Sequence, residues 1–260
     1  MRKLLFGLVG LLFVMSAQQP TCRNCSSTYI AKSEIDAYAA RVRGLPYERK
    51  GILYSEMFFL SLCTRASAPK RILESGRARG QSTLLLAICF PHLPIISLEH
   101  DPRSPDVPVA AERLRGRANV DLRFGDATRV LPHVAQVDDV ALIDGPKGWR
   151  GVRLALRLLA EGSVRMVFVH DVLPGTPERR FLEKWLPHAL YSDDRRFAAI
   201  AHRLDAAAAG SIPDGQRWDP DGDARYGYSL ACLQPPAGGG LGLARLAAIF
   251  AGLRRTAADA

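Results

Sequence analysis

The segment that decides the fold is residues 72–83, which read ILESGRARGQST. Ile72 and Leu73 begin a short apolar run that ends in the acid Glu74, and small residues follow at positions 76, 78 and 80. Small residues let the backbone turn sharply and pass close to a ligand, and the N-terminal amides of the helix that Ser82 opens attract a negative group. The segment therefore predicts a strand, a tight turn and a helix that together begin a ligand-binding βαβ unit.

The alternation of strand and helix continues along the chain. Candidate strands lie at 71–74, 94–99, 120–124, 140–144 and 165–170, and most of them are nearly continuously apolar, which is typical of strands covered on both faces. Helix-compatible stretches lie between and after them, at 81–89, 107–115, 127–134, 151–160 and 177–185. Two later runs, 196–202 and 226–233, are expected to be edge strands, one of them antiparallel. The pattern predicts an α/β fold, a doubly wound, mostly parallel seven-stranded Rossmann-like sheet with helices on both faces.

Further segments flank this sheet domain, which we place at residues 70–234. An N-terminal cap, 21–69, is expected to contain helices at 33–43 and 52–63. Residues 235–260 are predicted to be a Pro/Gly linker followed by an amphipathic helix at 241–255. The apolar run 4–15, which follows Arg2 and Lys3, makes residues 1–20 a signal peptide, a short membrane anchor, or sequence upstream of the true start.

The composition excludes several classes of protein. With 48% hydrophobic residues and ordinary Gly and Pro content, the chain is globular rather than disordered or collagen-like. Its net charge of +9 comes mainly from Arg, which is typical of a GC-rich genome, and the densest basic run, at 113–117, alternates with apolar or small residues on a predicted helix. We therefore expect a solvated basic face and no nucleic-acid partner. Five cysteines, with one CxxC at Cys22 and Cys25, predict neither a disulfide scaffold nor a zinc site.

Acidic residues end four of the predicted strands. Glu99 lies about 20 residues after the glycine turn, where an acid in a doubly wound sheet can accept both hydroxyls of a ribose. The glycine spacing is not the GxGxxG of dinucleotide binders, and no phosphate-gripping Lys follows it. A ribose acid together with a second acid, Glu74, favours a nucleoside that carries an ammonium group and no pyrophosphate. S-adenosylmethionine fits that description.

Residues 50–185 resemble class I S-adenosylmethionine-dependent methyltransferases, and among them the small Mg²⁺-dependent enzymes of the catechol O-methyltransferase type. ESGRARGQS at 74–82 is similar to the family's E-x-G-x-x-x-G-x-S turn. The likeness implies that Glu74 and Ser82 hold the methionine amino and carboxylate groups, and that Gly76, Ala78 and Gly80 form the cofactor-binding turn.

Two further segments carry the resemblance. ISLEHD at 96–101 is similar to the family's ribose-binding strand, which implies that Glu99 binds the ribose. RFGDATRVLP at 123–132 is similar to the segment that flanks the adenine, which implies that Asp126 and Ala127 lie near the base. An Asp in this position can equally be a helix cap. Gly145 and Pro146 stand where the family has aromatic adenine contacts.

The catalytic part of the resemblance is LIDGPK at 142–147, which implies that Asp144 is a metal ligand and that Lys147 deprotonates the acceptor hydroxyl. Lys147 can also be an exposed loop residue. The next strand ends in His170 and Asp171, where the family has Asp-Asn, and Mg²⁺ binds imidazole poorly. Three alternatives stay open: Asp144 and Asp171 hold Mg²⁺ with waters, the site with His170 uses a softer ion such as Mn²⁺ or Fe²⁺, or no metal binds and His170 is a general base.

The resemblance implies an enzyme that transfers a methyl group from S-adenosylmethionine to a hydroxyl of a small molecule with metal assistance. The alternatives are a degenerate methyltransferase scaffold that acts as a binding or assembly protein, and an RNA methyltransferase. The acceptor pocket is expected to involve the N-terminal helices and the loops 174–179 and 205–223, and Glu56 is either a pocket residue or a paired structural acid. We expect a cytoplasmic location, where the donor is made, with membrane anchoring through residues 4–17 as the alternative.

Overall fold

The structure is a computed structural model that describes residues 30–48, 51–65, 67–205, 229–235 and 248. The predictions for residues 1–29, for the loop after residue 205 and for nearly all of the C-terminal helix at 241–255 lie outside this part of the chain. No helix within the described ranges combines the length and the apolar character that crossing a membrane requires.

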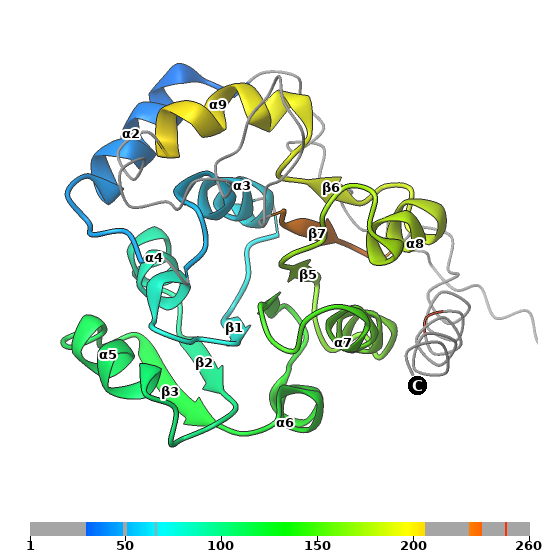
Figure 1. Cartoon of the computed structure of the whole chain (residues 1–260), viewed down its shortest axis with the longest axis horizontal. Helices are drawn as coiled ribbons and strands as arrows, with labels where there is room; N and C mark the ends of the chain where they lie inside the picture. Colours follow the sequence, from blue (N-terminus) through cyan, green and yellow to red (C-terminus); the bar gives the residue numbers. More distant parts are fainter. Residues whose placement is uncertain (1–29, 49–50, 66, 206–228, 236–247, 249–260) are drawn as a thin grey trace, which may run out of the picture.

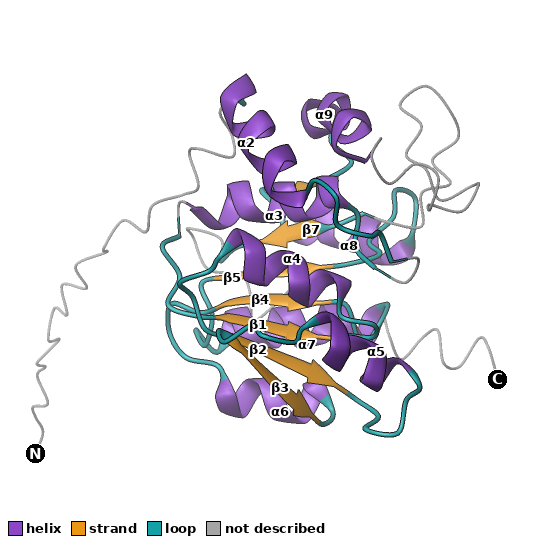
Figure 2. Ribbon diagram, turned by 90° about the vertical axis from the view of Figure 1, so that its left-hand side faces the viewer, coloured by secondary structure: helices purple, strands orange, loops and turns teal. Residues whose placement is uncertain are grey.

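A seven-stranded sheet forms the centre of the molecule, with the strand order β3-β2-β1-β4-β5-β7-β6. The first five strands are parallel to one another, and β7 runs antiparallel to both β5 and β6. Figure 2 shows them as one twisted stack. The prediction of a doubly wound, mostly parallel seven-stranded sheet is confirmed. The strands are β1 (Ile72–Ser75), β2 (Ile95–Glu99), β3 (Val120–Phe124), β4 (Val140–Ile143), β5 (Met166–Val169), β6 (Leu190–Tyr191) and β7 (Ala231–Leu233).

Helices cover both faces of the sheet because successive strand residues point to opposite sides. Ile72 belongs to a core shared with α2, α3, α4 and α9, whereas its neighbour Leu73 belongs to a core shared with α6, α7 and α8. Figure 1 shows these two groups of helices on opposite sides of the strands. The helices are α2 (Lys32–Val42), α3 (Tyr54–Arg65), α4 (Gln81–Cys89), α5 (Asp106–Arg113), α6 (Ala127–Val134), α7 (Trp149–Ala160), α8 (Pro177–Trp185) and α9 (Arg195–Asp205).

The N-terminal cap is built into the sheet domain. Phe59 of α3 meets Phe168 of β5 edge to face, with the ring centroids 6.2 Å apart, and Tyr38 of α2 packs on Phe58. Both helices therefore share one apolar core with the strands instead of forming a core of their own.

One predicted edge strand is wrong. The run 196–202 lies inside helix α9. The buried residues of this helix, Phe197, Ala201 and Leu204, recur at the spacing of one helix face. Phe197 packs against Phe59 of α3 with ring centroids 4.8 Å apart. The missing strand is instead β6, which has only two residues and leaves no periodic signal in the sequence. Residues 231–233 of the run 226–233 form the antiparallel strand β7, but this strand lies between β5 and β6 and is therefore not an edge strand.

The end of α9 is tied to the start of α3 by Asp205. Its Oδ1 accepts a hydrogen bond of 3.0 Å from the backbone N–H of Ser55. Burial raises the pKa of Asp205 from 3.8 to about 7, with the hydrogen bonds from Ser55 acting in the opposite direction. Asp205 was expected in an acceptor-binding loop; the structure shows that it is part of the helical packing.

Replacing Asp205 with Asn should flatten the pH dependence of stability between pH 4 and 7. A carboxyl group whose pKa is higher in the folded state favours the protonated fold, so its contribution declines as pH rises through this range. A rise of about 3 pKa units, at about 1.4 kcal/mol each, sets a ceiling of about 4 kcal/mol on that loss. Urea unfolding at several pH values measures it. Parallel curves for the wild type and Asp205→Asn would contradict the assignment.

Candidate functional site

The turn between β1 and α4 contains three small residues with a positive φ, at every second position. Gly76 has φ +84°, Ala78 +44° and Gly80 +81°, and Gly80 is the N-cap of α4. This left-handed backbone is the conformation that glycine adopts without strain. The turn therefore brings the backbone to the carboxyl end of β1, as the sequence predicts.

Glu74 lies beneath this turn with its side chain fully buried. Its Oε2 accepts hydrogen bonds from the hydroxyls of Thr83 and Ser97, and Ser82 lies near enough to help lower its pKa. Burial raises the pKa of Glu74, while these hydrogen bonds lower it. Its second oxygen, Oε1, is buried and has no hydrogen-bond partner. Glu74 and Ser82 are thus brought together, but neither lines the pocket described next.

A pocket opens at the carboxyl ends of β1 and β4, two neighbouring strands at the centre of the sheet. The strand order reverses there, because β2 and β3 continue the sheet beyond β1 and β5 continues it beyond β4. Open α/β sheets bind their ligands at such switch points. Four of the predicted cofactor residues line the pocket, namely Gly76, Glu99, Asp126 and Ala127. Its other walls are Ser75, Leu98, His100, Gly125, Gly145, Pro146 and Arg150.

Backbone hydrogen bonds fix the two acids of the pocket. The two carboxylate oxygens of Glu99 accept from the N–H groups of Ala78 and His100, each at 2.8 Å, so Glu99 is clamped between the turn and its own strand end. Asp126 accepts from the backbone and the hydroxyl of Thr128, at 2.9 and 2.7 Å, and these bonds lower its pKa. Asp126 is therefore both a helix cap and a pocket wall.

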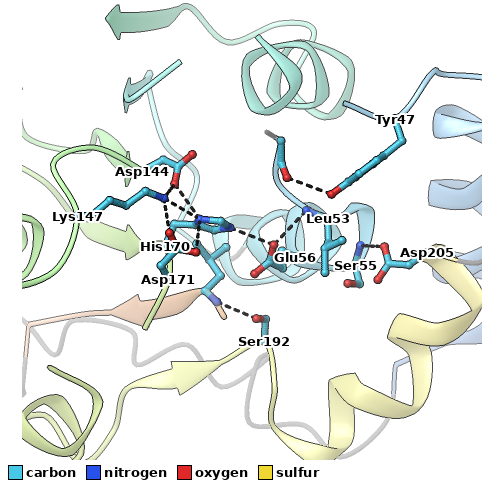
Figure 3. A network of polar contacts seen from close by, with 12 residues as sticks. Tyr47, Leu53, Ser55, Glu56, Asp144, Lys147, His170, Asp171, Ser192 and Asp205 are labelled. Carbon is cyan, nitrogen blue, oxygen red and sulfur yellow. Dashed lines mark hydrogen bonds and ion pairs between the residues drawn. The ribbon is translucent and has the colours of Figure 1, made fainter. Parts of the chain in front are cut away.

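The four residues predicted to carry the chemistry meet beside this pocket. Figure 3 shows Asp144, Lys147, His170 and Asp171 converging from the ends of β4 and β5. The ammonium of Lys147 pairs with Asp144 and lies 2.5 Å from Oδ2 of Asp171. Nδ1 of His170 lies 2.8 Å from Oδ1 of Asp144 and 3.2 Å from Oδ1 of Asp171. Gly145 and Pro146, which line the pocket, join Asp144 to Lys147 in the chain, so the cluster borders the pocket.

Glu56 completes this cluster from the opposite side. Its Oε2 lies 3.1 Å from Nε2 of His170, and both side chains are only 2% exposed. Carboxylates accept hydrogen bonds and do not donate them, so an imidazole with a carboxylate at each nitrogen is held as a double donor, the imidazolium. Burial lowers the pKa of His170, but Asp144 and Glu56 outweigh it and raise the pKa well above 6.5.

The charges of the cluster stabilise one another. Burial raises the pKa of Asp144, but the opposing effect of His170 and Lys147 is larger and holds this pKa well below its ordinary range. Burial also lowers the pKa of Lys147, while Asp144 and Asp171 raise it above its ordinary value. In this arrangement Lys147 is an ammonium group, although half of its side chain is exposed.

The donor set suits a divalent cation. Asp144, His170 and Asp171 each offer one ligand atom, and these atoms lie within 4.8 Å of one another. Oδ1 of Asp171 is buried and makes no hydrogen bond of good geometry, and its contact with Nδ1 of His170, at 3.2 Å, is an ion pair that a bound cation would replace. Two carboxylates with one imidazole fit Mn²⁺, Fe²⁺ or Zn²⁺ better than Mg²⁺, which prefers oxygen alone.

Sequence reasoning missed two pocket residues and left a third open. His100 and Arg150 line the pocket, and Nη2 of Arg150 lies 3.8 Å from Oδ2 of Asp126. Their only signal is position, directly after Glu99 and in the first turn of α7. Glu56 was left between a pocket residue and a paired acid, and the structure pairs it with His170.

Comparison with known proteins adds structural neighbours only. No protein-family model and no curated protein matches the chain. A SAH-bound methyltransferase of Podospora anserina is 17% identical, with 80% of this chain and 89% of that chain covered and a TM-score of 0.43. The O-methyltransferase TomG of Streptomyces achromogenes, in complex with SAM, is 19% identical over 80% and 92% of the chains, with a TM-score of 0.42. An O-methyltransferase of Bacillus cereus, in complex with SAH, is 18% identical over 82% and 95%, with a TM-score of 0.41.

Proposed function

We propose that this chain is an S-adenosylmethionine-dependent O-methyltransferase that methylates a hydroxyl of a small molecule with the assistance of a divalent cation. One observation carries the proposal: a switch-point pocket whose wall includes Glu99 borders a cluster of Asp144, Lys147, His170 and Asp171. A nucleoside site beside a group of proton-transfer residues is what methyl transfer to a hydroxyl requires.

The cofactor fits the residues that the turn presents. Glu99 would accept the ribose hydroxyls, since each of its oxygens keeps a lone pair after its one backbone hydrogen bond. Oε1 of Glu74 is a buried hydrogen-bond acceptor without a donor, and buried polar atoms are normally paired. This supports a role for Glu74 in holding the methionine ammonium. Asp126 and Ala127 would flank the adenine from the start of α6, with Arg150 facing them.

The cluster would position the acceptor and move its proton. When bound, a divalent cation supplies Lewis acidity that lowers the pKa of an acceptor hydroxyl. Asp144 and Asp171 would hold that cation instead of Lys147, and Lys147 would then lose the two charges that raise its pKa. A Lys147 that has lost its proton to solvent can take the proton of the hydroxyl. The hydroxyl oxygen then attacks the methyl group in line, the bond between sulfur and the methyl carbon breaks with its electron pair on sulfur, and S-adenosylhomocysteine leaves.

Calorimetric titration of the full chain with S-adenosylhomocysteine tests the cofactor assignment. We expect saturable one-to-one binding. Transfer of a labelled methyl group from S-adenosylmethionine to 3,4-dihydroxybenzoate or to simple phenols, with Mn²⁺ or Mg²⁺ present, then tests the reaction. If S-adenosylhomocysteine did not bind, the chain would be a degenerate methyltransferase scaffold, and the proposal would be refuted.

Replacing Lys147 with Met should reduce kcat by about 100- to 10,000-fold, the usual contribution of a general base. The affinity for S-adenosylhomocysteine should stay unchanged, because Lys147 does not line the cofactor pocket. Steady-state rates and calorimetry on the same preparations measure both quantities. Lys184→Met on α8 serves as the control, because the ammonium of Lys184 lies over the ring of Trp185, 5.8 Å from its centroid. An unchanged kcat in Lys147→Met would show that Lys147 is only a loop residue.

A further inference from the structure

Glu56 makes two contacts with the same oxygen. It is the third residue of α3, and its Oε2 accepts a 3.0 Å hydrogen bond from the N–H of Leu53, just before the helix. That contact is the capping-box arrangement, in which a Glu reaches back to the residue that precedes the first turn. Oε2 also faces Nε2 of His170, and Oε1 is buried without a hydrogen-bond partner. A cap alone does not account for a carboxylate that is 2% exposed and paired with an equally buried histidine.

The contact with His170 decides which ring nitrogen faces the cluster. Because Glu56 engages Nε2, Nδ1 points toward Asp144 and Asp171 (Figure 3). Histidines that bind metals commonly donate their other ring N–H to a carboxylate, which fixes the orientation and tautomer of the ring. Glu56 is placed to do this from a different helix, 114 residues away in the chain.

We propose that Glu56 is a positioning residue that holds His170 as a nitrogen ligand between Asp144 and Asp171, and that this site therefore prefers Mn²⁺ to Mg²⁺. The inference rests on the metal-assisted form of the proposed function. With Glu56 in place, the site offers two carboxylate oxygens and, once a bound cation has displaced the Nδ1 proton of His170 to solvent, one imidazole nitrogen. Affinity of a mixed oxygen and nitrogen site rises along the first-row transition ions from Mn²⁺ onward, whereas Mg²⁺ is bound through oxygen ligands, so one imidazole tips the site from Mg²⁺ toward Mn²⁺.

The test is metal binding by the full chain, measured without turnover. Mn²⁺ titration followed by electron paramagnetic resonance gives the affinity, competition with Mg²⁺ gives the preference, and electron spin echo modulation from ¹⁴N reports an imidazole ligand. We expect the wild type to show nitrogen modulation and to bind Mn²⁺ more tightly than Mg²⁺. Glu56→Gln should weaken Mn²⁺ binding about 10- to 100-fold, the usual effect of removing such a partner. The nitrogen modulation should decrease with it.

Asp205→Asn is the matched control. Asp205 is another buried carboxylate that accepts a hydrogen bond at the start of α3, from Ser55, and it acts on the residues of that helix start, not on His170. If Glu56 only caps the helix, Glu56→Gln and Asp205→Asn will both change stability and leave Mn²⁺ binding as in the wild type. That result would overturn the inference, and so would a wild type with bound Mn²⁺ but without nitrogen modulation.

A second variant covers the case in which Glu56→Gln does not fold. Glu56→Asp keeps the charge but shortens the side chain by one methylene, which withdraws the oxygen from His170, and it should lose Mn²⁺ affinity in the same direction. Calorimetry with S-adenosylhomocysteine on every preparation separates the two proposals. Cofactor binding without nitrogen modulation removes only the role of Glu56, whereas the absence of cofactor binding removes the proposed function itself.

Discussion

Replacing Asp144 with Asn is expected to lower the rate of methyl transfer at least about 100-fold, because it removes a proposed ligand of a cation whose Lewis acidity contributes several kcal/mol. Its Oδ1 contacts both cations of the cluster, His170 and Lys147, and its side chain is only 13% exposed. An amide there would leave the buried imidazolium of His170 and the half-exposed ammonium of Lys147 facing one carboxylate fewer, and an unpaired buried charge is costly. Initial rates at saturating S-adenosylmethionine measure the loss.

Chelation should have the same effect as this substitution. We expect EDTA to abolish turnover of the wild type and Mn²⁺ to restore it, whereas added Mn²⁺ should not restore Asp144→Asn. Asp121→Asn is the control, because Asp121 is an exposed acid that pairs with Arg123 on the edge strand β3. Full activity of the wild type in chelator would instead mean that His170 or Lys147 acts without a metal.

The sheet and the site at its edge could be predicted because their signals are local. Four of the five parallel strands are short apolar runs, and β3, with Asp121 and Arg123, is the exception. The acids at the ends of β1, β2, β4 and β5 fall at one edge because parallel strands share one direction. Glu99, Asp144 and Asp171 were placed in this way, and the structure brings the last two together with Lys147 and His170. The order of β1 and β4 at the centre then places the pocket where the sequence predicts it.

The parts that failed depend on contacts between distant segments. Phe197 and Leu204 are buried on one face of helix α9 because they pack in the core that α3 and the sheet share. From the sequence alone, the same run also fits an edge strand. The pairing of Glu56 with His170 joins residues 114 positions apart, and no spacing within either segment points to it. Arg150 reaches the pocket because α7 begins at Trp149, two residues earlier than the predicted helix at 151–160.

Replacing Gly76 with Ala is expected to reduce the affinity for S-adenosylhomocysteine at least about 100-fold and to destabilise the fold. Gly76 has φ +84°, which costs an L-residue about 1–2 kcal/mol. A Cβ atom there would also lie 2.5 Å from the backbone N of Gly145 and 2.7 Å from the carbonyl carbon of Asp144. Backbone atoms cannot turn aside as a side chain can, so the end of β4 must move, and overpacking of this kind costs typically about 1–3 kcal/mol more. Since about 1.4 kcal/mol is tenfold in affinity, a displaced pocket wall accounts for the expected loss.

Gly116→Ala separates the two causes. Gly116 has nearly the same φ, +78°, but a Cβ atom there meets nothing within 4 Å. Its substitution should therefore show the backbone strain alone, a loss of about 1–2 kcal/mol in the free energy of unfolding, with cofactor affinity unchanged. Urea unfolding and calorimetry on both variants measure the difference, which isolates the contact between the turn after β1 and the end of β4. A Cβ atom at Gly76 displaces Gly145 in the pocket and Asp144 in the cluster together, so the substitution should disturb the cofactor site. If the two variants lost equal stability and both bound S-adenosylhomocysteine as the wild type does, the turn at Gly76 would not be the cofactor-binding wall.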